Sequence, residues 1–512
     1  MRILCLLLAR VACGVDMDWR RSLQAGSIGG YPSFDEANDI LNFFLFKYPH
    51  LLRRELIGKS FEDRDIFAYR LFSESFPPLS QAPRLLLTSL MHGREPVTLT
   101  VSLYTMGSLL EEYTNNVTDS LYIVRTRELY IVPFVNPDAY AAGSAKGEFK
   151  YRKNRRPSCP GKSDSDGVDL NRNFGFHWAA SSDPCSEEYS GSHAFSEPET
   201  TAIANLGESI KVTSAVHLHS YGEILTYPFN WNASERMQPE HEQFFAELQT
   251  VWRFEKAGPA SETLRYITAG EATDYFYGSL GAVAMSPEIG LETDGFAPKS
   301  ERAMEIARTN YQRLRYWMFK SGPELILDMR VVEDGVVQIR VNNSGLFQSF
   351  EYTNLVIHQP GCDIQVTPLS RVDSLRTSGN ISIHVCKGTN LRSQPSQACI
   401  VELGLSCRCF DTSGMDANNL FGRISNFPFA ATLCQAGGIT EFNRSDDDSH
   451  EGPESAWPVV SLVLALSVIA GILLRITARN IAKPSASYVE IQLTPQEEDE
   501  DQFTTKRHSN GG

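Results

Sequence analysis

Hydrophobic positions between residues 30 and 322 follow two patterns. After Ser33, which has the character of a helix cap, apolar residues return every three or four positions, as in an amphipathic helix. Uninterrupted apolar runs at 84–90 and 129–135 are instead typical of strands that are covered on both faces of a sheet. Helical stretches separate these runs, and 301–319 has the pattern of a closing amphipathic helix. The pattern predicts an α/β domain over 30–322.

From 323 to 440 the pattern changes to short runs of alternating polar and apolar residues. Two such runs flank Asp334-Gly335, which is a hairpin signal, and further runs lie at 380–385 and 400–403. Cysteines gather in the same region: Cys362, Cys386, Cys399, Cys407, Cys409 and Cys434. We expect a separate, cysteine-rich all-β module that is braced by disulfides, with a pairing that the sequence leaves open.

A polar stalk at 441–456 leads to the segment 457–474, which carries no charged residue. As a helix this segment would span roughly 27 Å, about the thickness of a bilayer core. Basic residues follow at once, beginning with Arg475, which predicts that the C-terminal side is cytoplasmic. We therefore expect a single transmembrane helix, a type I orientation and a cytoplasmic tail at 475–512. The alternative interpretation is a buried core helix.

Both ends of the chain carry candidate targeting signals. Residues 1–14 resemble a short signal peptide, and the cysteines outside it form an even set, as disulfides require. Asn-x-Ser/Thr triplets are candidate glycosylation sites: Asn116, Asn232, Asn342, Asn380 and Asn443. These features predict an extracellular or luminal location, at the plasma membrane, Golgi or endosomes. In the tail, 488–491 resembles a tyrosine-based sorting motif and 497–501 an acidic cluster, which indicate trafficking adaptors as partners or simply a solvated tail.

Composition excludes one class of partner. The 47 Lys and Arg residues against 62 Asp and Glu residues give a net charge of −15. No basic stripe accompanies this balance, so we expect no nucleic-acid partner. An acidic surface favours the approach of cationic substrates, although its ordinary role is solubility.

A first piece of candidate chemistry lies where a predicted strand ends. The run 85–91 leads into the sequence His-Gly-Arg-Glu at 92–95. Gly93 lets the chain bend, so that His92 and Glu95 can point toward one centre. A histidine and a carboxylate are two of the three protein ligands that a catalytic zinc site needs, with one position left open for water.

Two further strands supply the missing groups. The strand-like run 214–218 carries His217 and leads to His219, and alternation places both histidines on one face, so it cannot choose between them. Glu288 ends another apolar run, where a general base would be expected.

These residues resemble the zinc metallocarboxypeptidases of the pancreatic carboxypeptidase A/B type over about residues 30–320. Besides the His-x-x-Glu pair and a distant second histidine, two segments and one spacing carry the resemblance. The segment 151–155 resembles one in which the family's last arginine polarises the scissile carbonyl, and 167–174 resembles its Asn-Arg segment. Tyr266 precedes Glu288 at the family's spacing. The resemblance implies a carboxypeptidase-like fold, with a mixed central sheet that is flanked by helices.

The resemblance also implies an activity, namely removal of single residues from the C-termini of peptides or proteins. One Zn²⁺ would be held by His92, Glu95 and His219, and Glu288 would be the general base. Arg155, the last arginine of 151–155, would stabilise the developing oxyanion. His217 would then be an ordinary strand histidine.

Other residues follow from the same resemblance. Asn171, Arg172 and Tyr266 would bind the free C-terminal carboxylate of the substrate, which limits the enzyme to trimming chain ends. Asp169 would orient His92 from behind. Neighbouring subsites would be lined by Arg94, Arg152 and Tyr221. A disulfide would join Cys159 and Cys185.

Substrate preference is less well defined by the pattern. The resemblance implies that Asn230, Glu271 and Thr273 line the side-chain pocket. Members that prefer basic residues usually carry an aspartate in place of Thr273 or Asn230, and this chain has neither. Glu271 could accept Lys or Arg, or it could be a bare surface glutamate. We expect a mixed or basic preference, and the alternative is a preference for neutral or hydrophobic C-terminal residues.

Some features depart from the pancreatic members. No activation segment fits between residues 15 and 30, and membrane-bound and regulatory members of the family also lack one while appending a β-sandwich, here at the place of 323–440. Two other functions make different predictions for these residues. A catalytically silent membrane glycoprotein predicts decay of the ligand or base set, and none is seen. A hydrolase of the same fold acting on non-peptide amides or cell-wall peptides would not need the carboxylate-binding set.

Overall fold

The computed structural model describes residues 17–73, 82–161 and 166–323, together with short segments between 325 and 411. The predicted signal peptide (1–14), stalk (441–456), membrane helix (457–474) and tail (475–512) lie outside the described residues. Within the described ranges, no helix combines the length and the apolarity that a membrane crossing requires.

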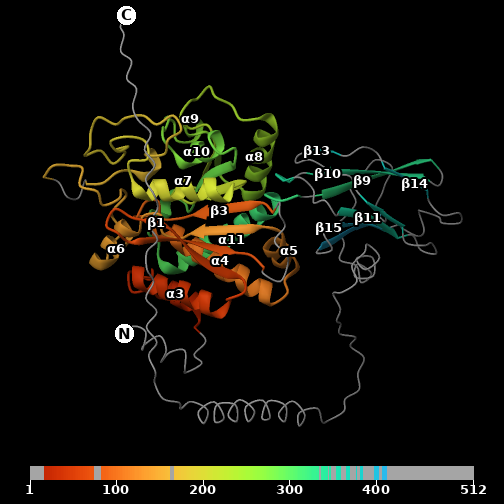
Figure 1. Ribbon diagram of the computed structural model, residues 1–512, viewed down its shortest axis with the longest axis horizontal. Helices are drawn as coiled ribbons and strands as arrows, with labels where there is room; N and C mark the ends of the chain where they lie inside the picture. The colour runs from red at the N-terminus through yellow and green to blue at the C-terminus, as the bar shows by residue number, and fades with distance from the viewer. Residues whose placement is uncertain are drawn as a thin grey trace, which may run out of the picture. The chain divides into compact units, whose positions relative to one another are not determined.

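A mixed eight-stranded sheet lies at the centre of residues 17–323 (Figure 1). In spatial order its strands are β1 (Leu52–Lys59), β2 (Asp65–Leu71), β4 (Glu128–Val132), β3 (Arg84–Thr88), β5 (Ser214–His217), β8 (Val283–Glu288), β6 (Ile224–Thr226) and β7 (Lys256–Gly258). The middle strands β4, β3, β5 and β8 are mutually parallel, and antiparallel pairs adjoin them on both sides. The predicted mixed sheet is therefore confirmed.

Two of the central strands are shorter than their apolar runs predict. β3 ends at Thr88 and β4 at Val132, although both hydrophobic runs continue. Leu90 has a φ of 51°, so the chain turns out of the sheet there while its side chain stays buried. Burial thus continues past the last strand residue, and hydrophobicity alone overestimates the strand length.

Helices cover both faces of this sheet, as predicted. α7 (Pro198–Ile210) and α10 (Ala272–Gly278) share a core with one face, and α3 (Phe34–Lys47), α4 (Pro96–Thr114) and α11 (Ser300–Lys320) share a core with the other. The remaining described helices are α2 (Trp19–Gln24), α5 (Thr118–Thr126), α6 (Pro137–Lys146), α8 (Pro239–Trp252), α9 (Ala260–Thr263) and the 3-10 turns η2 (Leu170–Arg172) and η3 (Glu292–Asp294). The cap expected before α3 is present, because Ser33 and Glu36 form a reciprocal capping box.

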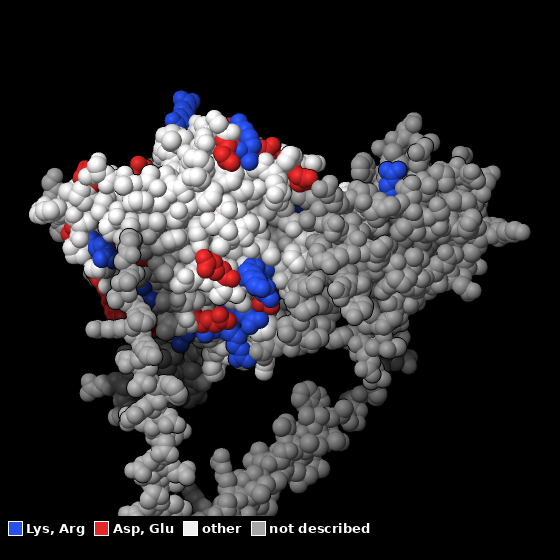
Figure 2. All heavy atoms as spheres, turned by 45° about the horizontal axis from the view of Figure 1, so that its top comes forward, with Lys and Arg blue, Asp and Glu red and all other residues white. Residues whose placement is uncertain are grey.

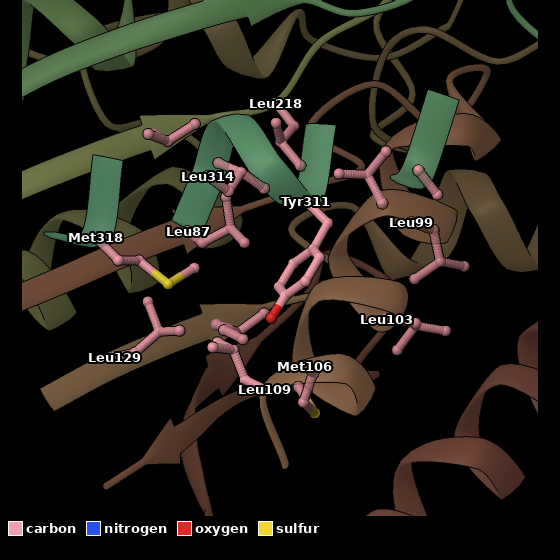
Figure 3. Packing of buried hydrophobic residues seen from close by; sticks show 14 of the residues in the cluster. Leu87, Leu99, Leu103, Met106, Leu109, Leu129, Leu218, Tyr311, Leu314 and Met318 are labelled. Carbon is pink, nitrogen blue, oxygen red and sulfur yellow. The ribbon is translucent and has the colours of Figure 1, made fainter. Parts of the chain in front are cut away.

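Helix α4 is buried along most of its length, in a core that it shares with the sheet and α11 (Figure 3). Side chains from β3, β4, α4 and α11 meet there, among them Leu87, Leu129, Leu99, Leu103, Met106, Leu109, Tyr311, Leu314 and Met318. Burying one such side chain contributes about 1.5–3 kcal/mol. This packing fixes the first turn of α4, and with it Glu95, the residue that precedes the helix.

Beyond residue 323 the described segments are antiparallel strands of two four-stranded sheets. One contains β9 (Leu325–Glu333), β10 (Val336–Asn343), β13 (Arg376–Thr377) and β14 (Ile381–His384), and the other contains β11 (Thr353–His358), β12 (Gln365–Pro368), β15 (Gln397–Glu402) and β16 (Ser406–Asp411). β9 and β10 pair with each other on either side of residues 334–335. The limits of 323–440 as a module, and its disulfides, stay predictions.

Acidic and basic side chains lie close together on the face seen in Figure 2. The ion pairs of residues 17–323 include Arg302 with Asp294 at 3.0 Å and Arg315 with Asp119 at 2.7 Å. Surface pairs such as Arg315 with Asp119 add little to stability, so we assign that pair to solubility rather than to the fold. The Asp294 side chain, in contrast, is only 12% exposed.

Candidate metal and substrate site

His92 and Glu95 lie in the turn that joins β3 to α4. The backbone N–H of Glu95 donates to the carbonyl oxygen of His92 (3.2 Å), which closes the turn. A Cβ atom at Gly93 would lie 2.6 Å from the Cβ of Ala139 in α6, closer than side chains can approach. Glycine therefore permits the turn and its packing, as the sequence predicted.

His219 reaches the same place from the end of β5. Its N–H donates to the carbonyl oxygen of Pro287 (3.0 Å), and this pairing with β8 brings Glu288 alongside it. His217 instead lies in the core, where its Nδ1 is 2.9 Å from the hydroxyl of Thr88. The structure therefore brings together His219, and not His217, with the two ligands from the β3–α4 turn.

The three candidate ligands are buried and face one another. Nδ1 of His92 lies 2.8 Å from Oε1 of Glu95 and 3.2 Å from Nδ1 of His219, which is 3.3 Å from Oε2 of Glu95. Tetrahedral zinc with bonds of about 2.0–2.1 Å separates neighbouring donor atoms by roughly 3.3 Å. Two imidazole nitrogens at this spacing, together with a carboxylate, fit Zn²⁺ and leave one coordination position for a further ligand.

Asp169 lies behind His92, as the resemblance implied. Its Oδ1 is 3.1 Å from Nε2 of His92, and its Oδ2 accepts hydrogen bonds from Arg152 Nη2 (2.7 Å) and Nε (3.1 Å). A proton on Nε2 leaves Nδ1 with the lone pair that faces the other ligands. Burial raises the pKa of the Asp169 carboxyl, but Arg152 and His92 outweigh this effect and hold the pKa well below its usual range.

Arg152, rather than Arg155, lies beside the metal ligands. Nη1 of Arg152 is 3.3 Å from Nδ1 of His92. Arg155 packs over the ring of Tyr151 at 4.7 Å, and its Nε is 3.7 Å from Oε1 of Glu62. The prediction that Arg155 lies at the oxyanion position is therefore wrong, and Arg152, which was expected to line a neighbouring subsite, occupies the place beside the ligands.

The hydrogen bonds of this segment explain the difference between the two arginines. Asp169 grips Arg152 with one carboxylate oxygen and so directs it inward. Asn154, between the arginines, is buried: its Oδ1 accepts from Val168 N–H (2.8 Å) and its Nδ2 donates to Glu197 (2.6 Å). These contacts come from distant segments, so the arginine-rich sequence at 151–156 carried no local signal of which arginine turns inward.

Glu199 also contacts Asn154, the buried residue between the two arginines. It accepts hydrogen bonds from Phe61 N–H (2.9 Å) and Asn154 Nδ2 (3.3 Å). Burial raises the pKa of Glu199 to about 7. An unfolded chain releases this proton near pH 4.3, so between the two pKa values only the native state holds it. The contribution of Glu199 to stability is therefore complete below the unfolded pKa and is lost as the pH rises through about 7.

We expect Glu199→Gln to remove this dependence. Relative to the wild type, the variant should gain about 3 kcal/mol in free energy of unfolding between pH 5 and pH 8. Urea unfolding of both proteins at the two pH values measures the difference, in which contributions from other titrating groups cancel. An equal difference between the proteins at both pH values would show that Glu199 is ionised throughout.

Glu288 ends β8 next to His219 and is partly exposed. Burial of the carboxyl group and the nearby charge of Glu95 raise the pKa of Glu288 well above its usual range, against the effect of Arg152. A cation held by the three ligands would lower this pKa again. A buried carboxyl group whose pKa is shifted by its surroundings, at this place beside the ligands, is a candidate for taking up and returning a proton.

Asn171 and Arg172 lie in the turn η2, which Asp169 caps and Leu170 begins. Oδ1 of Asn171 accepts from the N–H of Ala272, which orients the amide. The guanidinium of Arg172 is buried and donates through Nη1 to the carbonyl oxygen of Asn171 (2.9 Å). Tyr266 lies between α9 and α10 and is 47% exposed. The structure thus brings the Asn-Arg pair together and leaves Tyr266 accessible.

The predicted side-chain pocket is buried. Glu271 is only 5% exposed, which excludes the alternative of a surface glutamate. Its Oε2 accepts from Asn230 Nδ2 (2.7 Å), and its Oε1 lies 3.3 Å from Arg172 Nη1. The hydroxyl of Thr273, also buried, is hydrogen-bonded to Ser286. The pocket therefore contains one carboxylate that a substrate side chain could meet.

A second acid adjoins this pocket and was not predicted. Asp274 accepts hydrogen bonds from the backbone N–H groups of Asn230 and Trp231. Burial, together with the charge of Glu271, raises the pKa of Asp274 to about 8. Near neutral pH Asp274 is therefore largely protonated.

The remaining predicted residues lie at the edge of this site. The guanidinium carbon of Arg94 is 4.5 Å from the ring centre of Phe296, and the ring of Tyr221 contacts the same phenylalanine at 4.8 Å. Cys159 and Cys185 form the predicted disulfide. Phe296 had no signal in the sequence, because it lies in a loop with no periodic pattern.

Comparison with known proteins finds carboxypeptidases among the relatives of this chain. A family model described as zinc carboxypeptidase matches residues 38–313. Metallocarboxypeptidase A of Arthroderma otae is 32% identical over 236 residues, which span 43% of this chain and 53% of the relative. Carboxypeptidase A5 of Macaca fascicularis is 28% identical over 314 residues, 58% of this chain and 68% of the relative.

A solved structure agrees with the fold. Carboxypeptidase A from Helicoverpa armigera superimposes with a TM-score of 0.50 and 25% identity, over 60% of this chain and 77% of that one. The chain spans about half the length of the curated relatives that it matches, 53% of one and 59% of another. The family model covers more than half of the 512 residues, and its range contains the ligands, the Asn-Arg pair and Glu288. This chain belongs to the zinc carboxypeptidase family.

Proposed function

We propose that this protein is a zinc-dependent carboxypeptidase that releases single residues from the C-termini of peptides or proteins. The observation that carries the proposal is one connected arrangement. Asp169 supports the ligand His92 and the arginine beside it, and Asn171 and Arg172 follow two and three residues later, in the turn that Asp169 caps. A site for a metal and a site for a carboxylate are thereby held in fixed relation by one short segment.

The metal would be held by His92, Glu95 and His219. Bound zinc supplies a Lewis acid that acidifies water and polarises a carbonyl group. Glu288 accepts the proton of the attacking water and passes it to the leaving amine. Arg152 donates hydrogen bonds to the oxygen that gains negative charge. Arg152 is held by Asp169 before substrate arrives, which is the condition for efficient electrostatic stabilisation.

The carboxylate requirement explains trimming from the end. Arg172 has a planar guanidinium, which suits a carboxylate, and Asn171 and Tyr266 supply further donors. An internal peptide bond offers no carboxylate at this position, so internal cleavage should be absent. The same set argues against a hydrolase for non-peptide amides, and the complete ligand and base set argues against a silent glycoprotein.

We further infer a preference for cationic C-terminal residues, with neutral residues as the alternative. The support is the burial of Glu271 in the pocket, where its charge would be balanced by a Lys or Arg side chain. Arg172 and Asn230 already contact this carboxylate, so the preference over neutral residues should be partial.

Peptides that differ only in a final Lys, Arg, Leu or Phe test this preference on the purified full-length chain. We expect all four to be trimmed, with Lys and Arg fastest, and Glu271→Gln to reduce that advantage. Asn230 lies across the pocket, so Asn230→Asp is the matched change in the other direction and should increase the advantage. Equal rates for all four peptides with all three proteins would show that the pocket does not distinguish charged from neutral C-terminal residues.

For location, we infer a type I protein that is anchored by 457–474 and carries its enzyme domain outside the cytoplasm, with adaptors on the tail. The support is the uncharged segment followed by basic residues. Protection of an epitope at residue 512 from protease in sealed cells, while an epitope near residue 30 is accessible or luminal, is the expected result. The reverse accessibility would contradict this orientation.

A further inference from the structure

One loop next to the proposed active site carries two consecutive glutamates that face different arginines. The loop, 184–190, is anchored at Cys185 by the disulfide, and Lys153 Nζ donates to the carbonyl oxygen of Ser186 (2.8 Å). At its other end, the carbonyl oxygen of Tyr189 accepts from the N–H of Asp169 (2.8 Å). The loop is therefore held directly against the segment that contains Arg172.

Each glutamate pairs with an arginine of the site. Oε2 of Glu187 lies 3.0 Å from Nη1 of Arg94, and Oε1 of Glu188 lies 3.1 Å from Nη2 of Arg172. The two carboxylates are mostly accessible, with side-chain exposures of 58% and 52%. The side chain of Arg172 is 9% exposed. A buried cation thus meets an accessible acid beside the proposed carboxylate site.

Arg172 is paired on both of its terminal nitrogens. Glu188 contacts Nη2, and Glu271 approaches Nη1 at 3.3 Å from the pocket side. One positive charge therefore lies between two negative charges in a largely buried space. A substrate carboxylate would bring a third, and Coulomb repulsion between like charges is strong where water is excluded.

We propose that Glu188 is a specificity-determining residue, which holds Arg172 in the free protein and exchanges it for the cationic side chain of the substrate's last residue. A C-terminal Lys or Arg brings its own carboxylate to Arg172 and its own cation to the released Glu188, so every charge keeps a partner. A neutral last residue displaces Glu188 without offering a replacement. This proposal rests on the proposed carboxypeptidase function and adds a second acid to the one in the pocket.

The proposed exchange requires that the acid paired with Arg172 has an accessible side chain. A carboxylate that must leave Arg172 and turn to another cation needs freedom to rotate, and Glu188 has it, whereas Glu271 is fixed by Asn230. Glu188 is 52% exposed, so a substrate carboxylate can reach Nη2 of Arg172 and replace it there. Glu188 also competes with the carboxylate of every substrate, which should raise KM rather than lower kcat.

The test compares Glu188→Gln with Glu187→Gln, the same change one residue away. Both full-length variants are assayed on two peptides that differ only in a final Lys or Leu. For Glu188→Gln we expect KM to fall for the Leu peptide and to rise for the Lys peptide, so that the Lys/Leu ratio of kcat/KM falls about tenfold. The two peptides share their penultimate residue, so Glu187→Gln should affect both equally. The Lys/Leu ratio of this variant should therefore stay at the wild-type value. Glu188→Asp should retain part of the preference.

The outcomes separate the two proposals. If the wild type releases no residue from either peptide, the carboxypeptidase function is wrong. If it does release them and Glu188→Gln keeps the wild-type ratio, or Glu187→Gln lowers it equally, the role of Glu188 is wrong while the function stands. Thermal unfolding of each variant confirms that the exposed substitutions leave the fold intact.

Discussion

Glu288→Gln should lower kcat by a factor of about 10²–10⁴ with little change in KM. Glutamine has the size and shape of glutamate but cannot accept the proton of water at neutral pH. Glu288 is none of the three ligands, so zinc content should stay at the wild-type level. Single-turnover release of the last residue, measured together with metal content of the same sample, tests both parts of the expectation.

The matched control is Glu292→Gln in the turn after β8. Glu292 is exposed and lies outside the buried site, and the same change there should leave kcat within about twofold, as is usual for surface substitutions. A Glu288→Gln protein with full zinc and wild-type kcat would show that another group is the base.

The arginine beside the ligands gives the second large effect. Arg152→Ala should lower kcat/KM by a factor of about 10²–10³, the usual cost of removing one donor to a developing oxyanion. Arg155→Ala should change it by less than about threefold, because Arg155 packs on Tyr151 and faces Glu62. The pair of variants compares two arginines three residues apart in one segment.

Arg152→Lys separates charge from geometry. A lysine keeps the positive charge but has one nitrogen in place of the planar fork with which Arg152 donates to Asp169, so we expect activity between those of the wild type and the alanine variant. Metal content of each variant must be measured, since Asp169 also supports His92. If Arg155→Ala is the inactive variant and Arg152→Ala the active one, the placement of the two side chains is wrong.

Local sequence was sufficient where the chemistry depends on neighbours in the chain. His92 and Glu95 lie in one turn, with Gly93 packed closely against Ala139 between them, so local sequence marked a candidate ligand pair. The distant histidine and the family resemblance were needed to make that pair a predicted zinc site. The capping box before α3 and the long amphipathic helix near 300–320 are also local. The strand ends were predicted too far along the chain, because burial continues into the loops.

Local sequence was insufficient where a contact comes from a distant segment. Alternation placed His217 and His219 on one face, and only the pairing of His219 with β8 separates them. The choice between Arg152 and Arg155 depends on Asp169, which lies within the segment closed by the Cys159–Cys185 disulfide. The resemblance supplied the right set of residue types and the wrong arginine.

The electrostatics of the pocket could not be predicted from the local sequence either. Glu271 was equally compatible with a surface position and with a pocket, because nothing in its neighbours along the chain fixes its burial. The contacts that decide, with Arg172 and Asn230, cross the site. Glu188 had no sequence signal for the same reason, since an acidic residue in a loop is ordinarily a solvated one.

The central claim is that the three ligands, Glu288 and the Asn-Arg pair form one zinc carboxypeptidase site. The most direct measurement is mass spectrometry of a peptide and its C-terminal amide after incubation with the purified full-length chain, with and without a zinc chelator. We predict stepwise loss of single residues from the free peptide, none from the amide, and no loss from either with chelator until zinc is returned. Equal cleavage of the amide, or release that persists after the metal is removed and shown to be absent, would contradict the account.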